Sequence, residues 1–342
     1  MADMALDVAW DGLLAGLPMP AMLVERETRV AGCNEQGLAL FGAGVIGRNP
    51  AMAVRTPAVL EAIGTAARQG GVHEARMTLR RDGQEEVYAT TVSAQGPDMV
   101  LCVFRDMTEE ERAGEMRRDF VANVSHELRT PLTALMGFIE TLKHAARDDP
   151  KAREMFLGIM EHEAGRMNRL VRDLLHLSRV ESEARVRPRG EVELRPLLEG
   201  VIRSLRGVAD KAASSVLLDG DGSTVPGDAD QLTQVFTNLI ENALKYGAGG
   251  QVVRVSLSPE DTVRGPAVRV EVADRGEGIA PVHLPRLTER FYRVDSHRSR
   301  EMGGTGLGLA IVKHIVSRHR GWLRVESVVG EGSRFSVVLP LG

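Results

Sequence analysis

His126 lies in the segment FVANVSHELRTPL, residues 120–132, and three further segments follow it in the order NLIENALKYG, DRGEGI and GGTGLGLAIV. A neutral imidazole is a competent nucleophile. Asparagines on a helix and glycines in loops are the groups that let a backbone and its amides surround a nucleotide. The order therefore pairs a reactive histidine with a nucleotide pocket that is split among three segments.

The helical period of the first segment decides how His126 is presented. The apolar residues recur at spacings of four and three and form a seam suited to a helical bundle: Phe120, Val124, Leu128, Leu132, Leu135, Ile139 and Leu142. His126 falls nearly opposite this seam, with Thr130 and Thr133 on its own exposed face. Pro131 removes the amide partner of the Glu127 carbonyl and bends the helix. A bend beside an exposed imidazole indicates a moving reaction centre more than it indicates packing.

A second helix is predicted to begin at Asp149-Pro150, a cap residue followed by proline at the first helical position. Its apolar residues keep heptad spacing, with Glu163 at the one polar position: Phe156, Met160, Met167, Leu170, Leu174 and Leu177. One such hairpin has little core, and two copies related by a twofold axis would bury both seams in a four-helix bundle. The alternative is a hairpin that packs only on its own chain.

The segment from residue 228 to 246 predicts a helix with two faces. Its apolar stripe consists of Leu232, Val235, Phe236, Leu239, Ile240 and Leu244. Asn238, Glu241, Asn242 and Lys245 share another face. Amide and carboxylate oxygens are ligands that Mg²⁺ prefers, and Asn242 is the first candidate. Lys245 could place a compact positive charge at phosphates.

Glycine loops follow this helix. Asp274 ends the β-patterned run VRVEVAD, and Gly276 and Gly278 would let the backbone approach a flat ligand. Gly304, Gly306 and Gly308 precede the apolar helix AIVKHIV, whose amino end offers free amides to phosphates. Each glycine cluster alone is a weak signal, because an ordinary turn accounts for it more often than a ligand loop does. The prediction depends on the order of the clusters along the chain.

Through these segments the chain resembles the bacterial two-component sensor histidine kinases. FVANVSHELRTPL resembles their phospho-acceptor box, NLIENALKYG the asparagine box, DRGEGI and GGTGLGL the two glycine boxes, and ERFYRVD the phenylalanine box. The resemblance covers residues 106–342. With the amino-terminal part included, the chain is most similar to the phosphate-regulon sensor (PhoR-like) branch.

The resemblance implies a role for each matching residue. His126 is then the phospho-acceptor and Glu127 its acid/base partner, while Glu127 and Thr130 are spaced as in kinases that also dephosphorylate their regulator. Asn238 and Asn242 would lie at Mg²⁺ and the phosphates of ATP, and Lys245 at the phosphates. Around the base and under the lid the implied residues are Tyr246 (against adenine), Asp274 (on the adenine amino group), Gly276, Gly278, Phe291 (anchoring the lid), and Gly304, Thr305, Gly306, Leu307 and Gly308 (closing over the triphosphate). Thr288, Arg275 and Glu277 depart from the common pattern of the boxes, which bears on lid packing.

The expected fold class is multidomain α+β. It consists of a PAS-like sensor over residues 1–105, a dimeric antiparallel helical hairpin over 106–187, and a Bergerat-type α/β sandwich that binds ATP over 188–342. Residues 189–193, after Pro188, are expected to be a polar link to a mobile catalytic domain. The expected partners are a second copy of the chain and a response regulator, the phosphate-regulon (PhoB-like) regulator for the narrower resemblance.

The amino-terminal hundred residues predict a strand, a turn, a second strand and a short helix, followed by a meander of strands. Residues 81–83, Arg-Asp-Gly, have the composition of a hairpin turn. The run Asp106-Met107-Thr108 resembles the element that joins PAS domains to kinase helices, and Thr108 with Glu111 predicts a capping box there. His73 and Cys33 are isolated and predicted to be structural. A PAS domain that binds a ligand and one that only dimerises or relays remain open.

Composition bounds the class of protein. The 342 residues suit two or three domains, and a net charge of −4 gives no reason to expect nucleic-acid binding. Two cysteines, Cys33 and Cys102, make no disulfide framework, which fits a reducing cytoplasm. No apolar run approaches the ~20 residues of a membrane span, so a cytoplasmic chain is expected unless amino-terminal segments are missing.

Three alternatives to a kinase of the phosphate regulon stay open. One is a kinase of the same kind in another signalling pathway. Another is an ATP-hydrolysing conformational machine that shares the pocket, with Glu241 as the water-activating base, although FVANVSHELRTPL would then have no use. The third, a catalytically inactive scaffold, is disfavoured because no box is broken. The handedness of the loop at residues 144–151 decides whether a hairpin is phosphorylated by its own or its partner's catalytic domain.

Overall fold

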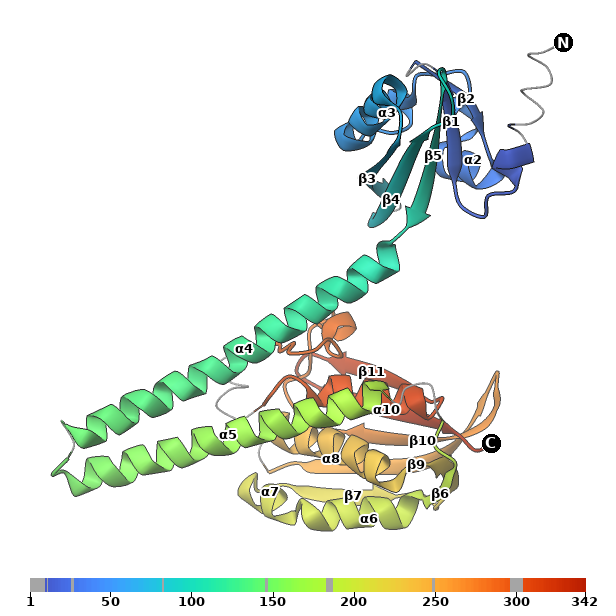
Figure 1. The fold of residues 1–342 in the computed structure, drawn as a ribbon. Helices are drawn as coiled ribbons and strands as arrows, with labels where there is room; N and C mark the ends of the chain where they lie inside the picture. The colour runs from blue at the N-terminus through green and yellow to red at the C-terminus, as the bar shows by residue number, and fades with distance from the viewer. Residues whose placement is uncertain are drawn as a thin grey trace. The chain divides into compact units, whose positions relative to one another are not determined.

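A computed structural model describes residue 10 and residues 12–25, 28–81, 83–144, 147–182, 187–247, 250–295 and 304–342. The chain forms two compact units, residues 1–122 and 123–342. Among the described residues, no helix is both long enough and apolar enough to cross a membrane. Figure 1 shows the helices and strands of both units.

The amino-terminal unit is a five-stranded antiparallel sheet with the strand order β2-β1-β5-β4-β3. Its strands are β1 (Ala21–Glu25), β2 (Arg29–Cys33), β3 (Val72–Arg81), β4 (Gln84–Ala94) and β5 (Met99–Asp106). Its helices are α2 (Glu35–Phe41) and α3 (Pro57–Gln69), with short 3-10 turns η1 (Ala43–Val45) and η2 (Pro50–Met52). The predicted order of strand, strand, helix and meander is confirmed.

The side chains of β1 alternate between two apolar clusters, as the period of two in a strand requires. Met22 and Val24 are buried in the larger cluster together with residues of α3, whereas Ala21 and Leu23 face a smaller cluster around Leu14. The hairpin at residues 81–83 is confirmed by the pairing of Arg81 with Gln84, although Asp82 lies outside the described residues. Cys33 and Cys102 are free thiols, and burial raises the pKa of Cys33 to about 11 and that of Cys102 to about 12.

The helix α4 (Thr108–Lys143) begins where the sequence predicts, but the predicted capping box is wrong. The hydroxyl of Thr108 accepts the amide of Val87 on β4, at 3.0 Å. The carboxylate of Glu111 pairs with Arg76 on β3, at 2.9 Å. The Asp106 side chain instead accepts the amide of Thr108, at 2.8 Å. Thr108 and Glu111 therefore bond to the neighbouring sheet and not, as a capping box requires, to each other's backbone amides.

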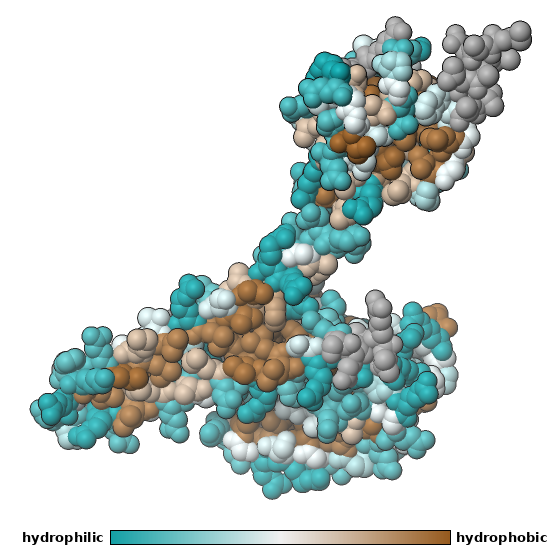
Figure 2. Space-filling view, in the orientation of Figure 1, coloured by the Kyte–Doolittle hydropathy of each residue, from teal (hydrophilic) through white to brown (hydrophobic). Residues whose placement is uncertain are grey.

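The helix α5 (Pro150–Ser182) follows α4 in the predicted hairpin. Asp149 Oδ1 accepts the amides of Lys151 and Ala152, at 2.9 and 3.1 Å, which confirms the predicted cap. Of the loop at residues 144–151, Ala145 and Ala146 lie outside the described residues. Figure 2 shows apolar side chains along the hairpin. The exposed members include Leu132, Met136, Ile139, Met155, Leu157 and Leu175.

The rest of the second unit is a mixed sheet with helices over one face (Figure 1). The strand order is β11-β12-β10-β9-β7, and only β7 and β9 pair in parallel among the described strands. The strands are β7 (Ser215–Asp219), β9 (Val252–Thr262), β10 (Gly265–Ala273), β11 (Trp322–Val328) and β12 (Gly332–Pro340). The helices are α6 (Leu194–Ser204), α7 (Arg206–Lys211), α8 (Ala229–Tyr246) and α10 (Gly308–Arg318), with the 3-10 turn η3 (Leu284–Arg286).

The polar link expected at residues 189–193 is wrong for most of its length. Residues 190–193 form β6 (Gly190–Glu193), which pairs antiparallel with β8 (Thr224–Gly227). Val192 is buried there against the domain. Three of the four residues of this short strand are exposed, and two of these are glutamates, a polar pattern that a linker shares.

A buried histidine joins α10 to α8. The amide of Asp228, the cap residue of α8, donates to His319 Nε2 at 3.0 Å, and His319 Nδ1 lies 2.8 Å from the Ile315 carbonyl. This pattern requires the neutral ring with its proton on Nδ1. Desolvation lowers the pKa of His319 below its ordinary value, because a charged ring would be buried and would lose the Nε2 acceptor.

We therefore expect the carboxy-terminal unit to lose stability as the pH falls through the ordinary histidine pKa of about 6.5, because the unfolded chain then binds the proton that the folded ring resists. His319→Leu should lower the free energy of unfolding at pH 8 by about 1–3 kcal/mol, since the Asp228 amide loses its acceptor, and should flatten the pH dependence. Urea unfolding followed by Trp322 fluorescence in a Trp10→Phe background measures both. His162→Gln, at an exposed histidine of α5, is the control. An unchanged pH slope in His319→Leu would contradict the assignment.

Candidate functional site

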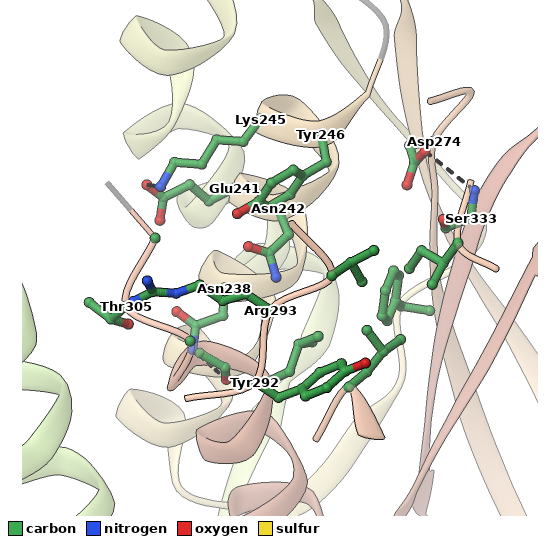
Figure 3. Close-up of a pocket in the computed structure, with 18 of the residues that line it drawn as sticks. Asn238, Glu241, Asn242, Lys245, Tyr246, Asp274, Tyr292, Arg293, Thr305 and Ser333 are labelled. Carbon is green, nitrogen blue, oxygen red and sulfur yellow. Dashed lines mark hydrogen bonds and ion pairs between the residues drawn. The ribbon is translucent and has the colours of Figure 1, made fainter. Parts of the chain in front are cut away.

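A cavity of about 450 Å³ lies in the second unit, within the range of small-molecule sites. It is lined by α8, by the loops after β10 and before α10, and by one face of α5. Most of the predicted nucleotide residues line it: Asn238, Asn242, Lys245, Tyr246, Asp274, Gly278, Gly304, Thr305, Gly306 and Gly308. Figure 3 shows the labelled side chains of this cavity. The fold therefore assembles segments that are far apart in the sequence.

The helix α8 carries the predicted polar face to this cavity because its apolar stripe is buried against the sheet. Asn238 and Asn242 lie one turn apart and differ in their bonds. The side-chain nitrogen of Asn238 donates to the Gly308 carbonyl at 3.1 Å, and its side-chain oxygen accepts from the Gln234 side chain at 2.9 Å. The Asn242 side chain makes no hydrogen bond to any residue that the structure describes, and it points into the cavity (Figure 3). Asn242 is thus the better placed of the two to bind a ligand.

Lys245 Nζ lies 2.8 Å from Glu241 Oε1, an ion pair between neighbouring turns of α8. Both side chains line the cavity, and the pair is drawn in Figure 3. The predicted phosphate-binding lysine is therefore neutralised locally. Glu241, the base required by the ATP-hydrolysing alternative, has one carboxylate oxygen occupied by the same contact.

Asp274 lies at the end of β10, and its carboxylate is fixed by the backbone. Its Oδ1 accepts the amides of Gly276 and Ser333, at 2.8 and 3.3 Å, and its own amide donates to the Ser333 carbonyl at 2.9 Å. Burial raises the pKa of this carboxyl above its ordinary value, and the two amide bonds oppose that rise. A half-buried carboxylate with a fixed orientation is suited to accept hydrogen bonds from a ligand.

Two glycines of the cavity have backbones that need the absence of a side chain. Gly278 has φ +69°, and a Cβ there would lie 2.0 Å from the Val328 carbonyl oxygen. Gly306 has φ +73°, and a Cβ would lie 2.9 Å from the Phe291 backbone. The Phe291 amide donates to the Gly306 carbonyl at 2.8 Å, so the phenylalanine and glycine segments pair closely. Gly276, Phe291 and Leu307 shape these loops without lining the cavity, and Leu307 is buried in the core.

His126 is exposed on α4, as predicted, and does not line the cavity. Its neighbour Glu127 is largely buried and accepts two arginines on Oε2. Arg166 of α5 donates at 2.7 Å and Arg293, which follows Phe291 and Tyr292, donates at 3.0 Å. In this arrangement the predicted acid/base carboxylate is bonded to arginines, one of which lines the cavity.

Thr130 and Thr133 are exposed, as the helical period predicts. The Thr130 hydroxyl donates to the His126 carbonyl at 3.2 Å. This is the backbone bond expected of a threonine one turn after its acceptor. A hydroxyl that donates still accepts hydrogen bonds, so the contact leaves a role toward water open.

Two more contacts join α5 to the loops around the cavity. Thr305 Oγ1 donates to Asp173 Oδ2 at 2.7 Å, and Arg290 Nη2 donates to Glu181 Oε1 at 2.5 Å. Burial raises the pKa of Asp173, while the Thr305 bond opposes the rise. Residues 296–303 lie outside the described residues, and Arg290 lies before them in the sequence and Thr305 after them. Both flanks of this segment are therefore bonded to the hairpin.

Sequence reasoning missed several residues of the cavity and its borders. They are Arg166, Arg169, Arg172 and Asp173 of α5, Gln234, Tyr292, Arg293 and Ser333. Arg293 lies inside the ERFYRVD segment and could have been examined there. The α5 residues gave no signal, because a charged residue on a helix is usually a solvated one.

Among the residues that the structure describes, no group of three or more histidine, cysteine, aspartate or glutamate side chains is arranged to hold a metal ion. A metal at this cavity would need amide or ligand oxygens. Mg²⁺ with a nucleotide takes only one or two protein ligands, so the oxygens of Asn242 and Asn238 are compatible with it.

Comparison with known proteins agrees with this geometry. The histidine kinase-, DNA gyrase B-, and HSP90-like ATPase family matches residues 227–342, and the histidine kinase A (phospho-acceptor) domain matches residues 116–183. These ranges contain the cavity loops and His126. The expected fold class, a helical phospho-acceptor region with an α/β sandwich, is confirmed.

Two relatives match more than two thirds of this chain. The phosphate regulon sensor protein PhoR of Pseudomonas aeruginosa is 40% identical over 237 residues, 69% of this chain and 53% of that protein. Sensor protein kinase WalK of Staphylococcus aureus is 38% identical over 242 residues, 70% of this chain and 57% of that protein. The chain thus spans about half of the length of these relatives. Histidine kinase ThkA, solved in complex with response regulator protein TrrA, is 21% identical over 97% of this chain and 98% of its own, with a TM-score of 0.52, which shows the fold.

Proposed function

Since the chain belongs to the sensor histidine kinase family, we propose that it transfers the γ-phosphoryl group of ATP to His126 and then to an aspartate of a response regulator. The observation that carries the proposal is the pairing, in one unit, of an exposed histidine with a cavity formed by Asn242, Asp274 and the glycine loops. The cavity fits a nucleotide, because Gly278 and Gly306 keep close backbone approaches open and Asp274 presents a fixed carboxylate.

In the proposed site the adenine amino group donates to Asp274, and Tyr246 and Gly278 border the base. The phosphates lie toward Lys245 and the loop of Gly304, Thr305, Gly306 and Gly308. Asn242, with Asn238 as the second candidate, would hold Mg²⁺, and the ion would supply positive charge at the phosphates. The remaining predicted residues, Gly276, Phe291 and Leu307, set the shape of the loops.

In the reaction a neutral nitrogen of His126 attacks the γ-phosphorus, the bond from phosphorus to the bridging oxygen breaks, and ADP leaves. The proton of the ring passes to Glu127, which must first exchange its arginine partners for His126. In the second step a regulator carboxylate attacks the same phosphorus and the phosphorus–nitrogen bond breaks. Catalysis rests on positioning and charge neutralisation rather than on covalent chemistry by the pocket.

We further propose a homodimer through the hairpin. The exposed apolar side chains on α4 and α5, Leu132 and Ile139 of the predicted seam among them, support a bundle of four helices in which two hairpins cover each other. The three-domain division at residues 105/106 and 187/188 belongs to the same proposal. Residues 1–105 act as a PAS sensor, which the antiparallel sheet with α2 and α3 packed against its larger apolar cluster supports.

His126→Ala should abolish labelling of the protein from γ-labelled ATP and leave ATP affinity nearly unchanged, because His126 lies outside the cavity. Asn242→Ala should abolish labelling by weakening ATP binding in the presence of Mg²⁺. Labelling is measured as acid-labile protein phosphate and affinity by calorimetry, with His162→Ala as the histidine control. Acid-labile phosphate on His126→Ala would overturn the phospho-acceptor. Released phosphate without labelled wild-type protein would indicate the ATP-hydrolysing alternative.

Thr130→Ala should retain autophosphorylation and slow the loss of phosphate from the regulator, because its hydroxyl, one turn from His126, is proposed to orient a water toward the phospho-aspartate. Decay of the purified phosphorylated regulator is the measurement. Thr133→Ala removes a second exposed hydroxyl of the same helix and serves as the control. Unchanged decay, or equal loss of both activities, would make Thr130 a structural residue.

The phosphate-starvation pathway is the narrower proposal, supported by 40% identity to PhoR, although WalK at 38% is nearly as similar. We expect transfer to the phosphate-regulon regulator, a PhoB-like protein, to be the fastest when the phosphorylated kinase is tested against each response regulator of its host. Faster transfer to another regulator would reject the pathway and leave the kinase assignment intact.

A further inference from the structure

One face of α5 forms part of the cavity wall, although α5 belongs to the phospho-acceptor hairpin. Arg169, Arg172 and Asp173 line the cavity. Their spacing of three and four residues places them on one side of the helix. The nucleotide cavity is therefore closed partly by a helix outside the ATP-binding domain.

The placement of this face is fixed by packing as well as by polar contacts. Leu170 and Leu177 of α5 are buried, and α5 contacts α10. Thr305, which is only 9% exposed, donates to Asp173 at 2.7 Å. Arg172 immediately precedes Asp173, and Arg169 lies one turn earlier. Both arginines therefore line the cavity from the side of α5.

The charges of the cavity set these two arginines apart from its other cations. Lys245 is paired with Glu241, and Arg293 is paired with Glu127. Arg169 and Arg172 are exposed, and no described carboxylate lies within ion-pair distance of either. Carboxylates also line the cavity, namely Asp173, Glu241, Asp274, Glu277 and Asp295. With the α5 arginines the lining has four cationic and five carboxylate side chains, and without them only two cations would face the five carboxylates, which disfavours a triphosphate.

We propose that Arg169 and Arg172 bind the phosphates of the nucleotide, so that the hairpin completes the nucleotide site. This inference rests on the proposed binding of ATP in the cavity. A guanidinium presents several donors in a planar fork and suits phosphate oxygens. The bond of Asp173 to Thr305 of the glycine loop holds the face of α5 that carries Arg169 and Arg172 against the cavity. The recognised feature is the phosphate chain, and neither arginine contacts the base.

As a consequence, nucleotide binding is coupled to the packing of α5 against the ATP-binding domain. The arginines come from the hairpin and the other phosphate ligands come from the ATP-binding domain. A ligand that contacts both favours the docked arrangement by its extra binding free energy. Adenosine, which has no phosphate, gains nothing from α5.

The test is calorimetric titration of the full chain with a non-hydrolysable ATP analogue, ADP and adenosine. We expect Arg169→Ala/Arg172→Ala to lower the affinity for the ATP analogue about tenfold, which corresponds to the loss of roughly one charge-assisted hydrogen bond. The affinity for ADP should fall less. Adenosine binding should be unchanged. Arg169→Lys/Arg172→Lys should retain most of the affinity, because the charge remains. Lys151→Ala/Arg153→Ala removes two exposed charges from the same helix, away from the cavity, and should bind as the wild type does.

Equal affinity of the alanine double variant and wild type would overturn the inference, provided that Asn242→Ala still weakens the analogue. Weakening of adenosine to the same extent would also overturn it, because the change would then be structural. If Lys151→Ala/Arg153→Ala lowered the affinity for the ATP analogue by the same factor, the effect would come from overall charge and the inference would be overturned. Failure of the wild type to bind the analogue would overturn the proposed function itself and the inference with it.

Discussion

The carboxylate of Glu127 is the point where the hairpin and the ATP-binding region meet. It accepts Arg166 of α5 and Arg293 of the cavity loop, and all three side chains are at most 15% exposed. A buried carboxylate is strongly unfavourable without such partners, and removing one leaves the others uncompensated. The residue after His126, the proposed phospho-acceptor, is therefore held by the loop that borders the cavity. The bonds of Asp173 and Glu181 to Thr305 and Arg290 extend the same docking along α5.

The cavity itself is built by backbone constraints rather than by a rigid set of charged side chains. Gly306 approaches the Phe291 backbone so closely that a side chain would not fit, and Asp274 is fixed by the amides of Gly276 and Ser333. These constraints come from the backbone of the chain itself. The charged lining is different, because its lysine and one of its arginines bond to carboxylates that a phosphate could replace.

Features that depend on neighbouring residues in the sequence could be predicted. The apolar stripe of α8, the exposed face of His126 and the Asp149 cap all follow from a local period or a local bond. Features that depend on distant residues could not. Thr108 and Glu111 bond to β4 and β3 instead of to each other, residues 190–193 pair with β8, and Arg166 reaches Glu127 across the hairpin. A polar side chain gives no sign in the sequence of which distant partner it will meet.

Asn238 and Asn242 illustrate the same limit within one motif. They occupy successive turns of α8 on one face, and the sequence offers both as metal ligands. In the structure the Asn238 side chain bonds α8 to the Gly308 carbonyl. The side-chain amide of Asn242 makes no hydrogen bond to any described residue. An amide that already has two partners must give them up to bind a metal, and that exchange costs free energy. We infer that Asn238 mainly fixes the position of the loop before α10 and that Asn242 provides the open ligand oxygen.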